Sequence, residues 1–258
     1  MPEGDNVYRT ARQLNDALAG SLLTGCDIRV PAFATVDLTG ETVHEVVSRG
    51  KHLLARIGED TLHSHLKMEG SWRVYRAGQR WGRPAFEARV VLQTAHVQAV
   101  GFALAEVKVV PRSQEHELVG HLGPDLLGDD WNPDEAVRRL DAQPDAPIAV
   151  ALLDQRNLAG LGNVYVNELC FLRGMLPTRP VADVDLRAAV DLAHRLITAN
   201  RDRPERTTTG DLRRGNRLWV YGRAGEPCRR CGTRIRHTRL GRTELELRET
   251  YDCPHCQA

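Results

Sequence analysis

Four cysteines near the end of the chain restrict its fold more than any other feature of the sequence. They form two C-x-x-C pairs separated by 21 residues, at Cys228, Cys231, Cys253 and Cys256. In a chain without an export signal, such pairs are typical of a four-thiolate zinc site rather than of disulfides. Four thiolates fill all the coordination positions of a tetrahedral zinc ion, so no position on the metal is left for a substrate. The spacing therefore predicts one structural zinc ion, Zn2+, held by a zinc-finger β-hairpin.

Composition and charge indicate a soluble globular chain with a basic C-terminal part. The 258 residues are 41% hydrophobic and 27% charged, which suits two domains with buried cores. The net charge is only +1, but residues 201–258 contain 14 Arg, no Lys and 8 acidic residues, a net charge of +6. Because the predicted metal site lies in this basic segment, we expect a face that binds nucleic acid. A solvated basic tail is the alternative.

The sequence contains no segment that predicts a membrane association. No apolar run approaches the 18 residues that a spanning helix needs, and the first twenty residues are polar and amphipathic. We therefore expect a cytoplasmic protein.

The hydrophobic pattern changes from β-rich to helical along the chain. Residues 5–19 have apolar side chains at helical spacing, and residues 22–110 consist of short β-rich runs separated by turns, typical of a sandwich or barrel. From Asn132 onward the pattern is helical. We predict an α+β multidomain protein with a β-sandwich flanked by helices at 1–125, a helical domain at 126–215 and the zinc hairpin at 216–258.

Pro2 and Glu3, at the start of the chain, are candidates for a nucleophile and a proton-transfer group. Removal of Met1 leaves a secondary amine on Pro2, and a free α-amine has a pKa of roughly 7.7–8.0. The uncharged amine attacks electrophilic carbon and gives an iminium, which is a good electron sink. Glu3 can move protons beside it. Taken alone, the pair is more typical of a frayed helix start.

Two further candidates lie where backbone can approach a phosphate. Gly160-Leu161-Gly162-Asn163 comes at a helix start, where the first amides and the Asn163 side chain can bind phosphate; a plain turn with an Asn cap is equally expected. Lys51 follows Gly50 between two strand-like runs, so we place it near a hairpin tip, where most lysines are only solvated.

Two side chains are candidates for direct contact with a duplex. Arg248 lies five residues before Cys253, in the arm of the zinc hairpin, from which an arginine can reach phosphate or base. Met68 lies in His65-Leu66-Lys67-Met68-Glu69-Gly70, ahead of a strand. An exposed Met at a loop tip suits a wedge between base pairs, whereas a core position at the strand end is the alternative.

These motifs together resemble the formamidopyrimidine-DNA glycosylase and endonuclease VIII family of base-excision repair enzymes. The match covers nearly the whole chain, and four motifs occur in the family's order. They are the Pro2-Glu3 opening, SRGKHLL with Lys51, LLDQRNLAGLGNVYVNE as a helix–two-turns–helix motif, and VYGRAGEPCRRCG with RETYDCPHC as the zinc finger.

The resemblance implies a role for each candidate residue. Pro2 is the nucleophile that attacks C1′, Glu3 manages protons, and Lys51, Asn163 and Arg248 hold phosphates beside the lesion. Met68 enters the gap left by the flipped base, which offsets part of an unstacking cost of about a few kcal/mol. The iminium then permits β,δ-elimination. The resemblance also implies a monomer at the nucleoid that acts on damaged DNA, duplex or single-stranded, without a small-molecule cofactor.

Departures from the family pattern favour its endonuclease VIII branch. Asp5-Asn6 replaces a more common pair, so a second acidic residue of the usual opening is missing. Either Glu3 then carries more of the proton transfer, or Asp5 assists it. The Arg-Arg-Phe wedge run is replaced by Val100-Gly101-Phe102, in which only Phe102 is available, and TTTGDLRRGN replaces a long lesion-capping loop. We therefore expect oxidised pyrimidines as substrates and an actinobacterial type of enzyme.

Two other functions remain open on the sequence. One is a zinc-dependent protein that binds damaged DNA without catalysis; the retained Pro2, Glu3 and Lys51 argue against it. The other is a purine-specific glycosylase for formamidopyrimidine or 8-oxoguanine, which the short loop disfavours.

Overall fold

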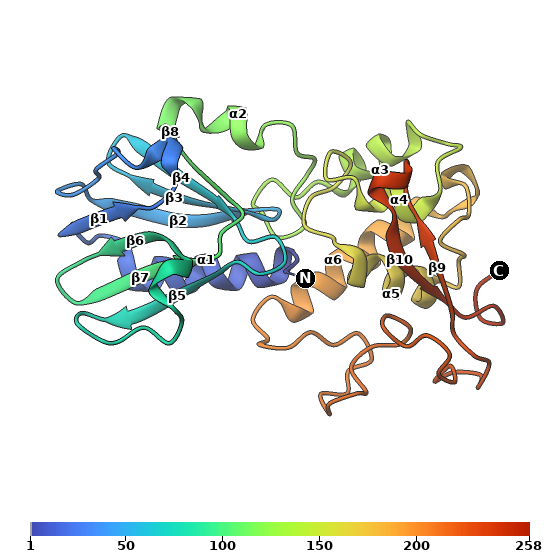
Figure 1. Cartoon of the computed structure of the whole chain (residues 1–258). Helices are drawn as coiled ribbons and strands as arrows, with labels where there is room; N and C mark the ends of the chain where they lie inside the picture. Colours follow the sequence, from blue (N-terminus) through green and yellow to red (C-terminus); the bar gives the residue numbers. More distant parts are fainter. Residues whose placement is uncertain (1) are drawn as a thin grey trace. The chain divides into compact units, whose positions relative to one another are not determined.

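The computed structural model describes residues 2–258, which form two compact units, Met1–His121 and Leu122–Ala258 (Figure 1). Met1, whose removal the sequence leads us to expect, lies outside the described residues. Within the described part of the chain, no helix combines the length and apolarity needed to cross a membrane.

The first unit is a β-sandwich, as the sequence predicts. Its two four-stranded sheets have the orders β1-β6-β7-β5 and β2-β3-β4-β8, and all neighbouring strands are antiparallel. The strands are β1 (Gly25–Ile28), β2 (Val43–Arg49), β3 (His52–Ile57), β4 (Asp60–His65), β5 (Ser71–Arg76), β6 (Ala88–Gln93), β7 (Val97–Phe102) and β8 (Glu106–Pro111).

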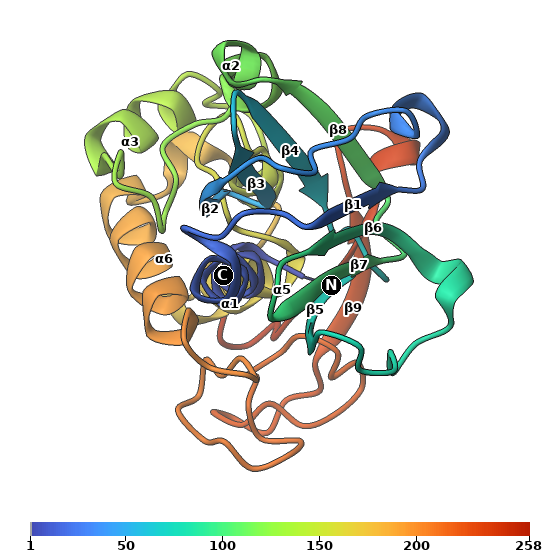
Figure 2. The same ribbon diagram turned by 90° about the vertical axis from the view of Figure 1, so that its left-hand side faces the viewer.

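Helix α1 (Gly4–Leu18) closes the core of this unit. The apolar residues whose spacing predicts the helix are all between 1% and 3% exposed: Val7, Ala11, Leu14 and Leu18. They pack against strands of both sheets, and Figure 2 shows the helix end-on beside them. Burial of this stripe fixes the rotation of α1, and with it the position of the residues that begin the helix.

Two local features of the first unit differ from the sequence pattern. The continuous β-rich run at residues 96–110 is two strands, and Ala103 adopts a left-handed conformation with φ of 47° where the chain passes from the sheet of β7 to the sheet of β8. A short helix, α2 (Glu115–Val119), lies between the β-rich residues 22–110 and the helical pattern that begins at Asn132. Glu115 accepts hydrogen bonds from Arg56 at 2.6 and 2.9 Å, which ties α2 to the sheet.

The second unit contains four longer helices, as its sequence pattern predicts, and the β-hairpin that precedes the last two cysteines. The helices are α3 (Pro133–Asp141), α4 (Ile148–Leu153), α5 (Asn163–Arg173) and α6 (Leu186–Asn200), and the hairpin is β9 (Arg236–Leu240) with β10 (Arg248–Asp252). Asn132 caps α3 by accepting from the Glu135 amide at 3.0 Å, and Gly174 ends α5 with φ of 68°. Short 3-10 turns occur at Pro31–Phe33, Ala85–Glu87, Arg112–Gln114, Val181–Asp183 and Glu244–Glu246.

A small apolar cluster joins the cysteine-rich segment to α5. Phe171 of α5 is fully buried against Val220 and Ile235, together with two of the four cysteines, Cys228 and Cys253. Trp219 stacks on the Phe171 ring, with the ring centroids 5.4 Å apart. The cysteine-rich segment is therefore packed on the same helix that begins at the predicted phosphate site.

Candidate functional site

The first turn of α1 places two carboxylates next to Pro2. Pro2 is half-buried, and Glu3, the N-cap residue, is fully buried. The Glu3 amide donates to Asn6 Oδ1 at 3.4 Å, and the Asp5 carboxylate, 3% exposed, accepts from the Asn6 amide at 2.8 Å. Negative charge is favoured at a helix N-terminus by the macrodipole. The chain thus has two buried carboxylates within three residues of Pro2.

Lys51 lies in the two-residue turn between β2 and β3, as the sequence predicts. Arg49 and His52 are opposite each other, so only Gly50 and Lys51 form the turn. Gly50 has φ of 58°, the conformation that a glycine supplies at the first position of a type II′ hairpin turn. The turn presents the half-buried Lys51 at the end of the sheet.

Met68 lies at the tip of a tight turn between β4 and β5 and is 69% exposed, so it is not a core residue. The Gly70 amide donates to the Leu66 carbonyl at 2.9 Å, which closes the turn beneath Met68. His52 is paired with His65, so the Lys51 turn and the Met68 turn lie at the same end of the sheet. Figure 1 shows the start of α1 at this end of the unit.

Phe102 does not serve as an exposed second wedge, contrary to the expectation from its sequence position. Its side chain is fully buried, with the rings of Tyr75 and Trp81 edge-on to it at 6.4 and 5.9 Å. The Arg83 guanidinium lies over the ring at 5.5 Å. Strand β7 directs the Phe102 side chain into an aromatic cluster. The sequence around Phe102 is apolar and does not indicate to which side of the strand the ring points.

The two turns between α4 and α5 are held by Gln155, a residue that the sequence analysis missed. Its side-chain amide donates to the carbonyls of Leu153 and Leu161 at 2.8 and 3.0 Å and accepts from the Gly160 amide at 3.0 Å. Gly160 has φ of 110°, a conformation that residues with a Cβ rarely adopt. These contacts fix the backbone that leads into α5 at Gly162 and Asn163.

Asn163 begins α5, but its side chain is directed at the protein. It is 5% exposed, and its Nδ2 donates to the Glu249 carbonyl of β10 at 2.7 Å. Asn167, one helical turn later, accepts from the Tyr251 amide at 2.6 Å. The two asparagines therefore attach β10 to α5, and one of the two Asn163 side-chain N–H donors is already used.

Arg248 starts β10 opposite Leu240 and is exposed. Within residues 2–258 its guanidinium makes no ion pair. Other arginines of the hairpin are paired, for example Arg239 with Glu249 at 2.9 Å. An exposed guanidinium without a carboxylate partner is available for a phosphate.

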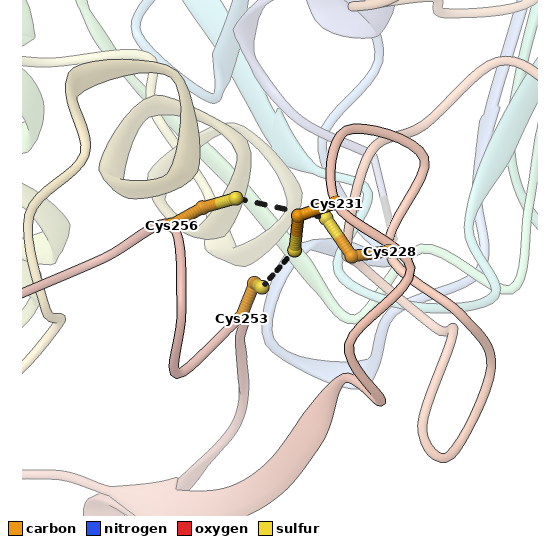
Figure 3. A group of neighbouring side chains, drawn as sticks. All are labelled: Cys228, Cys231, Cys253 and Cys256. Carbon is orange, nitrogen blue, oxygen red and sulfur yellow. Dashed lines mark hydrogen bonds between the residues drawn. The ribbon is translucent and has the colours of Figure 1, made fainter.

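The four cysteines converge, as their spacing predicts (Figure 3). Their sulfur atoms all lie within 4.8 Å of one another, with Cys228 and Cys256 4.0 Å apart and Cys231 and Cys253 3.5 Å apart. In a tetrahedral thiolate site with Zn–S bonds of about 2.3 Å, neighbouring sulfurs are about 3.8 Å apart. The cluster therefore has the dimensions to hold a metal ion with four sulfur ligands.

Glu168 organises the segment that leads into the cysteine cluster, and the sequence analysis missed it too. Its fully buried carboxylate accepts the amides of Trp219, Val220 and Tyr221 at 2.7, 2.9 and 2.9 Å and the Thr208 hydroxyl. Burial raises the pKa of this carboxyl, while the four donors favour its charged form. In the sequence, the buried role of Glu168 is indicated only by the position of this acidic residue in the otherwise largely apolar run 164–172.

Comparison with known proteins identifies the class that this fold and these sites define. Models of the formamidopyrimidine-DNA glycosylase N-terminal domain and of its H2TH domain match residues 1–103 and 122–200. The chain belongs to the formamidopyrimidine-DNA glycosylase family, and the resemblance seen in its motifs is confirmed.

Particular relatives align along their whole length. A probable endonuclease 8 2 of Streptomyces coelicolor is 55% identical, with 100% of this chain and 94% of the relative covered. The DNA-(apurinic or apyrimidinic site) lyase Nei2 of Mycolicibacterium smegmatis is 54% identical, with 100% and 99% covered. In fold, the chain matches Lactococcus lactis Fpg, solved with DNA containing an abasic site, with a TM-score of 0.83, 24% identity and full coverage of both chains.

Replacement of Glu168 by Gln should destabilise the second unit by about 1–3 kcal/mol, because the new NH2 group faces amide donors that lose their acceptor. Urea unfolding followed by tryptophan fluorescence measures the loss. Glu226→Gln is the matched control, since Glu226 is exposed and its partner is Arg223. Equal stability of the two variants would contradict the anchoring role of Glu168.

Proposed function

We propose that this protein is a bifunctional DNA glycosylase and AP lyase of base-excision repair, with the Pro2 amine as its nucleophile. The observation that carries the proposal is the start of α1, where Pro2 is followed by the buried carboxylates Glu3 and Asp5. It occurs in a chain of the formamidopyrimidine-DNA glycosylase family, with relatives named as endonuclease 8 and as an AP lyase.

The chemistry follows from a secondary amine beside a carboxylate. The Pro2 nitrogen attacks C1′ of the damaged nucleoside, the bond to the base breaks, and the departing base takes up a proton. Loss of the ring oxygen from C1′ gives an iminium, which makes the C2′ proton acidic. Glu3, held in place as the N-cap of α1, moves protons during base loss and ring opening. Successive β- and δ-elimination release the two phosphates that flank the sugar.

DNA is held from both units of the chain in this proposal. Lys51 binds a phosphate from its hairpin tip, and Arg248 binds one from β10. Asn163 contributes its remaining side-chain N–H and the N-terminal end of α5, where anions are favoured. Met68, exposed on its closed turn, occupies the space that the flipped base leaves.

Oxidised pyrimidines are the bases that the chain suits best. Two observations support this preference: relatives at 54–55% identity include one named probable endonuclease 8 2, and the segment between α6 and Arg217 is short. That segment is folded on itself, since the Thr207 hydroxyl accepts from the Gly210 amide at 3.1 Å and donates to the Asp211 carbonyl at 3.0 Å. A purine-specific enzyme is the alternative, as the family includes both.

The cysteine cluster is proposed to hold one structural zinc ion. Four thiolates satisfy a tetrahedral Zn2+ and leave no open coordination position, so the metal supplies cross-linking and no chemistry on DNA. It would fix the ends of the β9–β10 hairpin relative to α5.

The protein acts as a monomer in association with the nucleoid.

Borohydride trapping on a labelled duplex with an abasic site tests the nucleophile. Reduction of the iminium should give a band shifted by the mass of the protein, weak or absent for Pro2→Thr. The sharpest control inserts one arginine before Pro2, which keeps the Pro2 nitrogen in an amide bond. No band from a preparation shown by mass spectrometry to begin at Pro2 would favour the alternative of a non-catalytic DNA-binding protein.

Arg248→Ala should weaken binding to damaged and undamaged duplex alike, because a phosphate contact carries no sequence information. The slope of log affinity against log salt should become shallower by about 0.9, the value for one phosphate. Arg239→Ala removes the same charge from the other strand of the hairpin, where Glu249 already pairs with it, and should change the slope less. An unchanged slope in Arg248→Ala removes this residue from the phosphate contacts.

Cys228→Ser should remove the metal and with it DNA binding, while the first unit stays folded. Zinc content measured by atomic emission should fall from about one ion per chain in the four-thiolate site. Cys26→Ser, which alters a half-buried cysteine of the first unit, should keep the metal. Normal DNA binding by Cys228→Ser would rule out the structural role of zinc.

A further inference from the structure

Four histidines gather on one face of the β2-β3-β4-β8 sheet, next to the Met68 turn. His52 of β3 is central: His63 stacks on it with ring centroids 5.0 Å apart, and His65 and His121 meet it edge-on at 5.1 and 6.2 Å. Glu106 is paired with His65 across the sheet. None of the functions assigned above uses this cluster.

Hydrogen bonding fixes the protons of the inner two rings. His52 Nδ1 and His63 Nε2 are 2.8 Å apart, so one of them donates to the other. His63 Nδ1 is buried and has no partner within residues 2–258. A buried N–H without an acceptor is rarer than an unused acceptor, so we infer that His63 Nε2–H donates to His52 Nδ1. Both rings are then neutral, and the proton of His52 is on Nε2.

His65 is linked to the turn that carries Met68. Its Nδ1 accepts the Lys67 amide hydrogen at 3.0 Å. Only a ring with a bare Nδ1 can accept, so this hydrogen bond requires the neutral form of His65 protonated at Nε2. Lys67 has φ of 51°, an uncommon conformation for a residue other than glycine. The bond to His65 stabilises that conformation and directs the next residue, Met68, outward.

The surroundings of His65 favour its neutral form. Burial, followed by the positive charges of Lys67 and Lys51 and the neighbouring His63, lowers its pKa to about 4, and Glu106 opposes them. His52, which faces it from β3, has a pKa lowered to about 3, chiefly by burial. From β8, Lys108 lowers and Glu106 raises the pKa of His63. In the folded protein His65 is therefore neutral and accepts the Lys67 amide at pH 7, and this hydrogen bond is lost as the pH falls through about 4.

We propose that His65 is a positioning residue for Met68: its neutral ring holds the Lys67 amide and so presents the Met68 side chain, and a proton on Nδ1 releases the turn. The proposal rests on the wedge role of Met68 proposed above. His52 supports it by packing edge-on against His65, and His63 stacks on His52 from the other direction.

The Lys67 amide reports this bond directly, without DNA. The chain has three lysines, at positions 51, 67 and 108, so 15N-lysine labelling gives three backbone signals, and Lys108 in β8 is the internal reference. Hydrogen exchange at Lys67 should be slowed at pH 7 and lose its protection near pH 4. In His65→Leu the protection should already be lower at pH 7 by roughly tenfold, the equilibrium value of one hydrogen bond.

His65→Asn is the matched variant that separates hydrogen bonding from packing. An asparagine oxygen accepts the amide two residues later in an Asx turn and does not titrate. Protection of the Lys67 amide should therefore return in His65→Asn and persist at pH 4. Unchanged protection in His65→Leu, or a loss in His65→Asn equal to that in His65→Leu, overturns the proposal.

A double-mutant cycle shows whether His65 acts through Met68. We expect base release from a lesion-containing duplex, measured in single turnover, to fall in His65→Leu and in Met68→Ala, and the double variant to match Met68→Ala alone. Additive losses would mean that His65 acts independently of Met68. A Met68→Ala variant with full activity would instead disprove the wedge role, whatever the Lys67 amide shows.

Discussion

One row of polar side chains on α5 determines how the second unit is built. Asn163, Asn167 and Glu168 are all buried, and each bonds to backbone far away in the sequence: the asparagines to β10, the glutamate to residues 219–221. A buried amide without a partner costs about 1–3 kcal/mol, so these bonds cannot be exchanged for solvent without loss. The apolar contact of Phe171 and the cysteine cluster depend on this arrangement.

In the first unit, too, a few hydrogen bonds fix the segments that carry the candidate site residues. The turns that present Lys51 and Met68 are each two to five residues long and are fixed by a few hydrogen bonds of their backbone amides at the end of a sheet, one of them to the His65 side chain. The core of this unit is chiefly apolar. The candidate DNA-binding residues of this unit, Lys51 and Met68, therefore lie on short turns whose geometry is determined by the strands on either side.

Much of the fold was predictable because it depends on short-range patterns. Helical spacing predicted α1 and the helices of the second unit, and the C-x-x-C pairs predicted the cluster of four cysteines. The break at Ala103 was not predictable, because no glycine marks the left-handed residue. The burial of Phe102 depends on which side of β7 faces the aromatic cluster, and the run around it is apolar on both sides. The partners of Glu168 lie 40 to 53 residues away, beyond any local pattern.

The attachment of β10 to α5 has a consequence for how such a protein measures DNA. Because Asn163 donates to the carbonyl of Glu249, the residue next to Arg248, the separation between these two proposed phosphate contacts is an internal dimension of one folded unit. We expect this fixed separation to determine, before any DNA binds, which interval between two phosphates along a strand the protein accepts. A damaged strand whose backbone takes up that interval with little deformation should then bind at lower cost.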